Sequence, residues 1–195
     1  ANKGDYDLLL VGLGQSIFEG SLLGRILGFT TRIIDPDRFF NTVTGKEKLF
    51  ERSPFEESTR MILARSEVPV GILLDKNLSK IEKVFMPIFD HKDAFLIKYA
   101  QKLISNSGAQ VTILDANGRV KESGMKELIR EIEQNAPNHI YLLNQTPIGK
   151  DTLLQQDLMI VSLDSWKRLI EKQTSWLTNT PSVLIISENH VHRQI

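Results

Sequence analysis

The residues of this sequence that could bind a phosphate group are glycines close to the N-terminus. Gly12, Gly14, Gly20 and Ser21 follow a strand-like apolar run, in the pattern Gly-x-Gly-x5-Gly-Ser. A glycine-rich turn between a strand and a helix lets backbone N–H groups approach a phosphate. The alternative, which we favour, is that these glycines allow close backbone packing, since the spacing is not GxGxxG. The four residues are therefore a candidate ligand-binding loop with a degenerate phosphate-binding pattern.

The histidines offer two further kinds of chemistry. His91 stands between Asp90 and Asp93, and a histidine titrates near neutral pH, so His91 is a candidate pH sensor. The alternative is an exposed loop residue. His190 and His192 have a spacing that could chelate a metal, but no cysteine or carboxylate pair accompanies them, so a solvated tail is favoured. We expect no metal site.

Catalytic patterns are missing from the sequence. There is no G-x-S-x-G turn to support a Ser–His–Asp arrangement, and the chain has no cysteine that could supply a thiolate. We therefore expect no catalytic residue, no cofactor and no enzymatic activity.

Composition excludes other classes. The 195 residues include 24 Lys and Arg and 24 Asp and Glu, so the formal net charge is zero. A general nucleic-acid binder needs a positive field, so we expect no nucleic-acid partner. No apolar run reaches the roughly 20 residues that span a bilayer. The chain begins Ala-Asn-Lys and enters a strand-like run by Asp7, so we expect it to be part of a longer polypeptide.

The region Lys83–Asp115 gives the clearest prediction of secondary structure. An apolar run at Val84–Phe89, helical spacing over Asp93–Ser107 and a second apolar run at Gln110–Leu114 predict one βαβ unit with parallel strands. Five further strands are expected, at Tyr6–Leu13, Val68–Leu74, His139–Leu143, Asp157–Leu163 and Val183–Ser187. Further helices are expected after Ser16, after Ser53, around Met125–Ile132 and over Ser165–Leu177, whereas Thr146–Gln155 is ambiguous.

An internal repeat organises these elements. Tyr6–Gly12 matches Gln156–Ser162, and Val68–Leu74 matches Thr180–Ile186. Each copy of the repeat is therefore a strand led by Asp, then a helix, then a strand with Pro at its start. The first copy carries an insertion at about Thr30–Glu67. We therefore expect two regions, residues 1–80 as the C-terminal part of a first repeat and residues 81–190 as a nearly complete second repeat. Within each copy the two strands should be parallel, Tyr6–Leu13 with Val68–Leu74 and Asp157–Leu163 with Val183–Ser187.

The order of these elements resembles the universal stress protein fold, a five-stranded doubly wound sheet. The segments that carry this resemblance, in chain order, are KVFMPIF, QVTILDA, HIYLL, DLMIVSL and PSVLIIS. The resemblance implies an α/β fold of the adenine nucleotide alpha hydrolase-like type, a doubly wound parallel sheet. ATP-binding relatives place an Asp after the first strand and a glycine-rich loop after the fourth. Asp90 follows the first strand here, one position late, but no glycine follows Leu163 and Asp164 would repel a phosphate, so we expect a degenerate pocket.

A more specific resemblance is to the C-terminal cytosolic region of bacterial and plant monovalent cation:proton antiporters. There, two stress-protein-like repeats follow the membrane domain, and a YDLxxVG strand leads to a CPV strand. Tyr6-Asp7-Leu8 and Val68-Pro69-Val70 fill those places here, with Glu67 where that family often has another residue. The resemblance covers most of residues 5–188, apart from the insertion.

This resemblance implies a non-catalytic regulatory or assembly domain on the cytoplasmic face of the inner (plasma) membrane. Its expected partners are the membrane antiporter domain of the same polypeptide, a second copy in a homodimer, and an unidentified small-molecule or nucleotide signal. The alternative is a stand-alone nucleotide-binding module of the stress-protein type. For the dimer, the sequence points to the helix face of Gly20, Gly24 and Gly28 and to the edge of Tyr6–Leu13.

Overall fold

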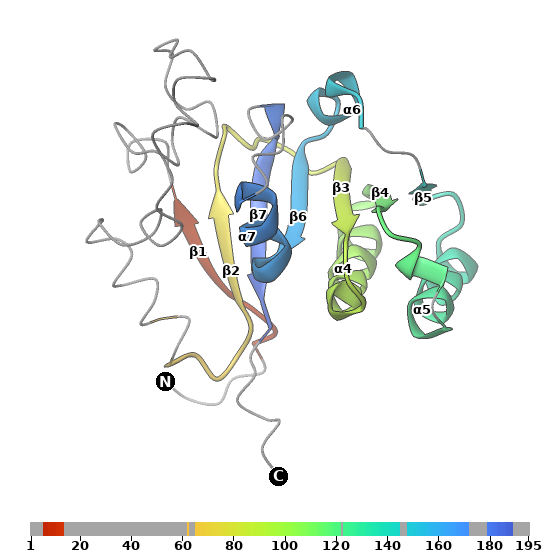
Figure 1. The fold of residues 1–195 in the computed structure, drawn as a ribbon, viewed down its shortest axis with the longest axis horizontal. Helices are drawn as coiled ribbons and strands as arrows, with labels where there is room; N and C mark the ends of the chain where they lie inside the picture. The colour runs from red at the N-terminus through yellow and green to blue at the C-terminus, as the bar shows by residue number, and fades with distance from the viewer. Residues whose placement is uncertain are drawn as a thin grey trace.

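One mixed sheet runs through the part of the chain that the structure describes. The computed structural model describes residues 6–13, 62, 65–121, 123–144, 148–171 and 179–188. The sheet has seven strands in the order β1-β2-β7-β6-β3-β4-β5 (Figure 1). The strands are β1 (Leu9–Leu13), β2 (Val70–Leu74), β3 (Lys83–Ile88), β4 (Gln110–Asp115), β5 (Ile140–Leu143), β6 (Leu158–Ser162) and β7 (Ser182–Ser187).

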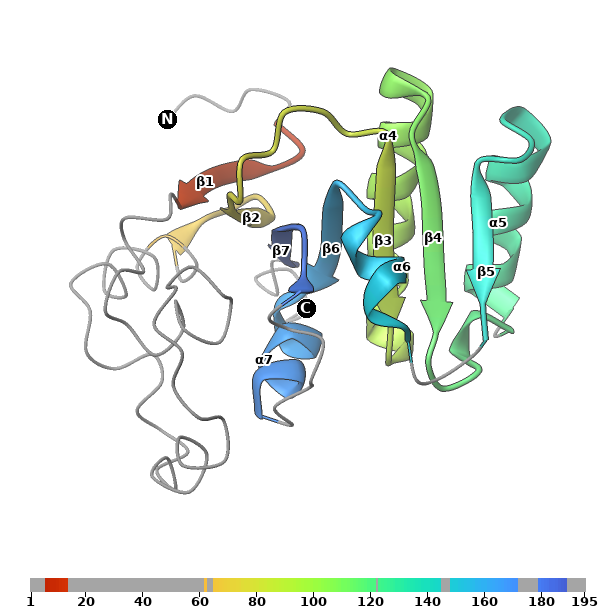
Figure 2. The ribbon, with the colours of Figure 1, turned by 90° about the horizontal axis from the view of Figure 1, so that it is seen from above.

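Helices cover both faces of this sheet, so the fold is a doubly wound α/β fold. The helical segments are η2 (His91–Leu96), α4 (Ile97–Ser107), η3 (Arg119–Lys121), α5 (Ser123–Asn135), α6 (Lys150–Leu154) and α7 (Leu163–Glu171). Figure 2 shows α4 and α5 on one face and α7 on the other. No helix in the described part is both long and apolar enough to cross a bilayer.

Two apolar clusters, one on each face, hold the helices to the sheet. Side chains alternate along a strand, so β3 sends Val84, Met86 and Ile88 into the cluster with α4 and α5, and Phe85 into the cluster with α7. All four are fully buried. A strand buried on both faces reads as a continuous apolar run, which is why the sequence locates β3 and β6 well.

The strands β3 to β7 form a complete unit, in the spatial order β7-β6-β3-β4-β5 with all neighbours parallel. The strand order reverses between β3 and β6. This is a topological switch point, where the carboxyl ends of the strands leave a crevice in doubly wound sheets.

Among the described residues, β1 and β2 form a second unit that extends the sheet beyond β7. They pair in parallel, as β6 and β7 do, which confirms the pairing predicted from the internal repeat. The two units meet through an antiparallel pair, β2 with β7. The expectation of a wholly parallel sheet was therefore wrong at this one pair. Antiparallel pairing of equivalent strands relates the two units by an approximate twofold axis. The boundary between two repeats near residue 80 stays a prediction.

Some helix ends differ from the expectation. The helix predicted from Asp93 begins earlier, as a tight turn at His91, because Asp90 caps it. The helix predicted from Ser165 begins at Leu163, immediately after β6. The ambiguous segment contains the short helix α6. The predicted helices after Ser16 and Ser53, and the glycine face of Gly20, Gly24 and Gly28, lie outside the described residues.

Lys76 ties the two units together where β2 ends. Its backbone N–H donates to the Ser182 hydroxyl at 2.9 Å, and its amine donates to the Thr180 carbonyl at 3.0 Å and the Thr180 hydroxyl at 3.3 Å. Burial lowers the pKa of Lys76 from 10.5 to about 8. The folded state therefore loses this proton more easily than the unfolded chain does.

This difference in pKa predicts that the unfolding free energy rises with pH in the alkaline range. Between pH 8 and 10.5 the unfolded chain holds the Lys76 proton and the fold has released it, so raising the pH stabilises the fold. Relative to Lys76→Met, wild type should gain unfolding free energy across this window, measured by urea denaturation. Lys80→Met is the control, because Lys80 is exposed and pairs with Glu82, which raises its pKa. A constant difference between wild type and Lys76→Met across the window would contradict the prediction.

Candidate functional site

The carboxylate of Asp93 is the centre of the crevice at the switch point. Asp93 is 1% exposed and accepts hydrogen bonds from four other residues. The Ser162 hydroxyl donates at 2.5 Å and the Ser165 hydroxyl at 2.9 and 3.0 Å. The backbone N–H groups of Phe89 and Asp90 donate at 2.9 and 3.0 Å. Every one of these partners is a donor, so the network suits an ionised carboxylate, which accepts only.

Local sequence places each member of this network. Asp90 and Asp93 form a capping box at the start of η2, in which each side chain accepts from the backbone of the segment. Ser162 is the last residue of β6, and its hydroxyl also accepts from the Ser165 N–H at 3.1 Å, which caps the first turn of α7. The turn after β3 and the junction of β6 with α7 are thereby joined through one side chain.

The position of Asp93 has an electrostatic consequence. The N-terminus of a helix carries a partial positive charge and attracts anions. In doubly wound folds that bind nucleotides, phosphate occupies such a helix start at the switch point. Here the Asp93 carboxylate lies at the start of α7 and bonds to its first-turn serine. The protein therefore supplies its own anion at this place.

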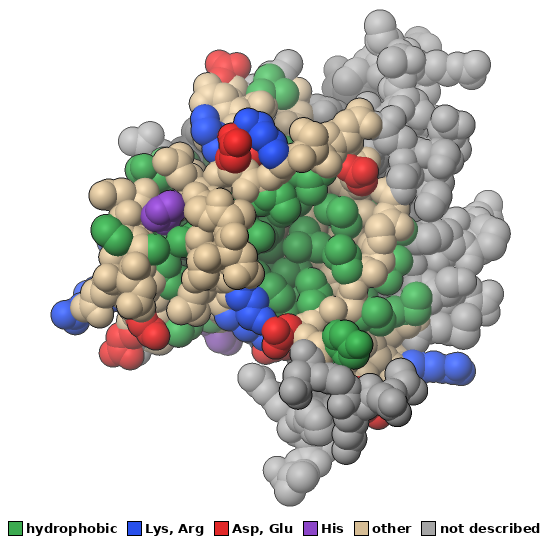
Figure 3. Space-filling model, turned by 180° about the vertical axis from the view of Figure 1, so that it is seen from behind, with side chains coloured by type: hydrophobic (Ala, Val, Ile, Leu, Met, Phe, Trp, Pro, Cys, Tyr) green, Lys and Arg blue, Asp and Glu red, His purple; other side chains and the backbone are tan. Residues whose placement is uncertain are grey.

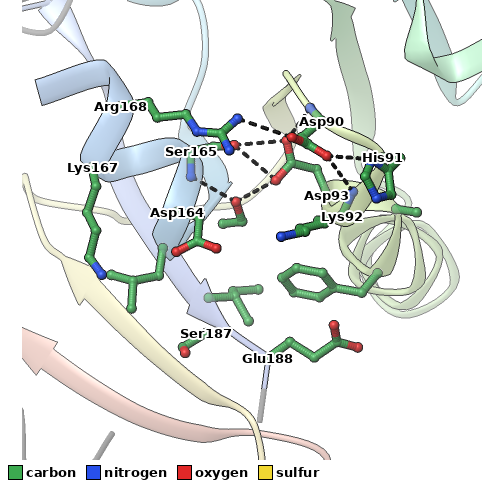
Figure 4. A pocket seen from close by; sticks show the side chains of 15 residues that line it. Asp90, His91, Lys92, Asp93, Asp164, Ser165, Lys167, Arg168, Ser187 and Glu188 are labelled. Atoms are coloured by element: carbon green, nitrogen blue, oxygen red, sulfur yellow. Dashed lines mark hydrogen bonds and ion pairs between the residues drawn. The ribbon is translucent and has the colours of Figure 1, made fainter. Parts of the chain in front are cut away.

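A cavity of about 500 Å³ opens beside this network. Figure 4 shows Asp93 directed toward Ser165, with Asp90 directed toward Arg168. The cavity is lined by residues of η2, the start of α7 and the end of β7: Asp90, His91, Lys92, Asp93, Ala94, Phe95, Ser162, Leu163, Asp164, Ser165, Lys167, Arg168, Ile186, Ser187 and Glu188.

Charge within the cavity is mixed and partly paired. Asp90 lies 2.7 Å from the Nδ1 of His91 and 3.3 Å from the guanidinium of Arg168. The Lys92 backbone N–H, together with Arg168 and His91, holds the pKa of Asp90 below its usual value. Within the described part of the chain, Lys92 and Lys167 make no ion pair.

This arrangement favours binding over catalysis. Both serine hydroxyls donate to Asp93, and His91 bonds to Asp90 rather than to either serine. A serine nucleophile needs an adjacent base that accepts its proton and is itself oriented by a third group. A buried carboxylate that already accepts from several donors is a structural cross-link. The cavity offers charged side chains to a small polar molecule.

The residues named from sequence are only partly brought together. His91 lines the cavity, with its side chain 65% exposed, and its role as a pH sensor stays a prediction. Gly12 lies in β1, outside the cavity, and a Cβ atom there would have no atom of the described residues within 4 Å. Gly14, Gly20 and Ser21 lie outside the described residues, so the candidate loop is not tested.

Sequence reasoning missed the network of Asp93, Ser162 and Ser165. It considered Asp93 only as a neighbour of His91. A usable signal existed: Asp90 and Asp93 have capping-box spacing after one apolar strand, and Ser162 and Ser165 have the same spacing at the end of another. What the sequence could not show is that the second Asp reaches across to the serines.

Comparison with known proteins gives structural likeness only. No family model matches the chain, and no curated protein matches it. Among solved structures, it is similar to a universal stress protein from Archaeoglobus fulgidus, with 14% identity and a TM-score of 0.46 over 95% of this chain and 62% of that one. It is also similar to the cytoplasmic domain of a prokaryotic cation chloride cotransporter, with 15% identity and a TM-score of 0.40 over 70% of this chain and 60% of that one. The chain thus spans less than two thirds of each.

The Asp93 network predicts a selective loss of stability. Asp93→Asn removes the charge and sets an amide N–H group against donors, so it should lower the unfolding free energy by about 2 kcal/mol or more in urea titrations. Asp164→Asn is the matched control, because Asp164 is exposed in the first turn of α7, next to Ser165, and its replacement should change stability by about 0.5 kcal/mol or less. Equal losses in the two variants would show that Asp93 is not the cross-link described.

Proposed function

We propose that this chain is a non-catalytic regulatory or assembly domain of a membrane cation:proton antiporter and acts on the cytoplasmic face of the membrane. The observation that carries the non-catalytic part is the Asp93 carboxylate at the start of α7. At the position where doubly wound sheets usually bind a ligand, this carboxylate instead links the turn after β3 to the start of α7.

Binding of a phosphate at this position would be opposed by charge repulsion and by a lack of free hydrogen-bond donors. It would face the buried carboxylate of Asp93 and the exposed carboxylate of Asp164, and like charges at short range repel. The donors that a phosphate would use, the two serine hydroxyls and two backbone N–H groups, are already engaged. The charge repulsion and the engaged donors support a domain whose crevice does not bind a nucleoside triphosphate.

The antiporter part of the proposal is supported by sequence. The strand with Tyr6-Asp7-Leu8, the strand with Val68-Pro69-Val70 and the next strand at Lys83 follow the order of the antiporter C-terminal region. Their pairing in one sheet is compatible with two repeats of one type, because β1 with β2 repeats the pairing of β6 with β7.

A second candidate function is a stand-alone nucleotide-binding module, or a domain that senses a small polar molecule. The observation in its favour is the cavity of about 500 Å³ with Lys92 and Lys167 on its wall. An anionic group could pair with these lysines without reaching the start of α7. Such a ligand would serve as a signal to the domain.

Nucleotide titration separates the two candidates. Isothermal calorimetry of the purified chain with ATP, in the presence and absence of Mg²⁺, should show no saturable binding or only weak binding, because Asp93 holds the phosphate position. Lys92→Ala and Lys167→Ala should leave the trace unchanged. A micromolar dissociation constant that weakens in the lysine variants would favour the nucleotide-binding module instead.

Transport by the complete gene product tests the antiporter role. The gene should encode about a dozen apolar spans before Ala1, and vesicles from cells that express it should show cation-dependent proton movement. Asp93→Asn should change the pH or cation dependence of transport by loosening the domain, and Asp164→Asn should not. A gene product without transport activity, or transport that is identical in both variants, would contradict the role.

A further inference from the structure

The cavity at the switch point has a second end, away from the pairing of Asp90 with Arg168. Figure 4 shows Ser187 and Glu188 at this end, and it shows the Lys92 side chain directed into the cavity. Lys92 belongs to η2, whereas Ser187 and Glu188 are the last residue of β7 and the residue after it. The part of the cavity lined by Lys92, Ser187 and Glu188 is called the β7 end below.

Two opposite charges at the β7 end are available to a ligand. Lys92 is exposed and Glu188 is half-buried. Within the described residues, neither the Lys92 amine nor the Glu188 carboxylate makes a hydrogen bond or an ion pair. Asp90 differs from them, since its carboxylate already lies 2.7 Å from the Nδ1 of His91 and 3.3 Å from the guanidinium of Arg168.

An aromatic ring lies near the Glu188 carboxylate. Phe95 is half-buried, lines the cavity and meets Tyr99 edge-on, with the ring centroids 6.4 Å apart. Burial, followed by the carboxylates of Asp7 and Glu188, raises the pKa of Tyr99 from 10.0 to about 12, so Glu188 is also a neighbour of Tyr99. An ammonium group that lies beside both an aromatic ring and a carboxylate is attracted by both.

We propose that the β7 end of the cavity binds a zwitterion of amino-acid or dipeptide size. Its carboxylate pairs with Lys92, and its ammonium group pairs with Glu188 beside the ring of Phe95. The carboxylates of Asp93 and Asp164 at the start of α7 repel the ligand carboxylate from the other end. The volume of about 500 Å³ lies within the range of small-molecule sites, roughly 300 to 1,000 Å³.

Other classes of ligand fit this wall less well. A simple anion would be repelled by Asp93, Asp164 and Glu188. A metal cation would be repelled by Lys92 and Lys167, and the described residues contain no group of three acidic, histidine or cysteine side chains to hold it. A wholly apolar ligand would cover charged groups without pairing them. Apolar surface lies elsewhere: Figure 3 shows apolar side chains gathered in a hollow on the face that carries α4.

The proposal rests on the sensing role given above as the second candidate function, and it names the class of ligand. The two can fail separately, because the ATP titration and the vesicle transport assay contain no amino acid or dipeptide.

Calorimetric titration of the purified chain with the standard amino acids and a set of dipeptides tests the ligand class. At least one of these zwitterions should bind saturably. Acetylation of its amine, or amidation of its carboxylate, should raise the dissociation constant at least about tenfold, because one of the two ion pairs is then lost. The absence of saturable binding by every compound at millimolar concentration would overturn the proposal, as would equal binding of the ligand and both of its modified forms.

Variants of the chain test the place of binding. Lys92→Gln and Glu188→Gln should each raise the dissociation constant at least about tenfold. In Glu188→Gln, acetylation of the ligand amine should cost little further affinity, which would assign that amine to Glu188. Lys126→Gln and Glu127→Gln are the matched controls, since both residues are exposed on α5, outside the cavity, and should leave the constant unchanged. Circular dichroism checks that all four variants fold. Binding that is as tight in Lys92→Gln and Glu188→Gln as in the controls would overturn the proposal.

Discussion

The buried carboxylate of Asp93 is the interaction on which the functional interpretation depends. A carboxylate that is 1% exposed is tolerated only when its charge is compensated by hydrogen bonds, and here two hydroxyls and two backbone N–H groups provide them. Because the donors come from the end of β3 and from the junction of β6 with α7, the bond network fixes the geometry of the crevice at its deepest point. A crevice held in this way is suited to transmitting or resisting movement between two elements, and poorly suited to receiving a phosphate.

The second constraint is the joint between the two units. β2 and β7 meet antiparallel, so the parallel pair β1–β2 lies across from its counterpart β6–β7. Lys76 reinforces the joint from the end of β2 by bonding to residues that lead into β7. The sheet therefore has the five-stranded unit with its crevice on one side, and the pair β1–β2 on the other.

The sequence predicts the seven strands well. The strands β3, β6 and β7 are buried on both faces, so each is a continuous apolar run without alternating polar residues. It also predicts the pairing of β1 with β2, because the Asp-led and Pro-led strands recur. It could not predict the antiparallel joint, which depends on which edges meet in space. Nor did it predict the Asp93 network: the capping box at Asp90 is local and readable, but the reach of Asp93 to Ser162 spans 69 residues and follows only from the strand order. His91, chosen for its chemistry, lies at the rim of the cavity beside Asp90.

The most direct test of the central claim is to observe the donors of the Asp93 network while nucleotide is added. In a two-dimensional NMR spectrum of the ¹⁵N-labelled chain, the amide signals of Phe89, Asp90 and Ser165 report on the place that a phosphate would take. If the Asp93 carboxylate holds that place, these three signals should stay fixed as ATP is raised to millimolar concentration. A saturable shift of these signals would contradict the account, because it would show that phosphate competes successfully with the buried carboxylate.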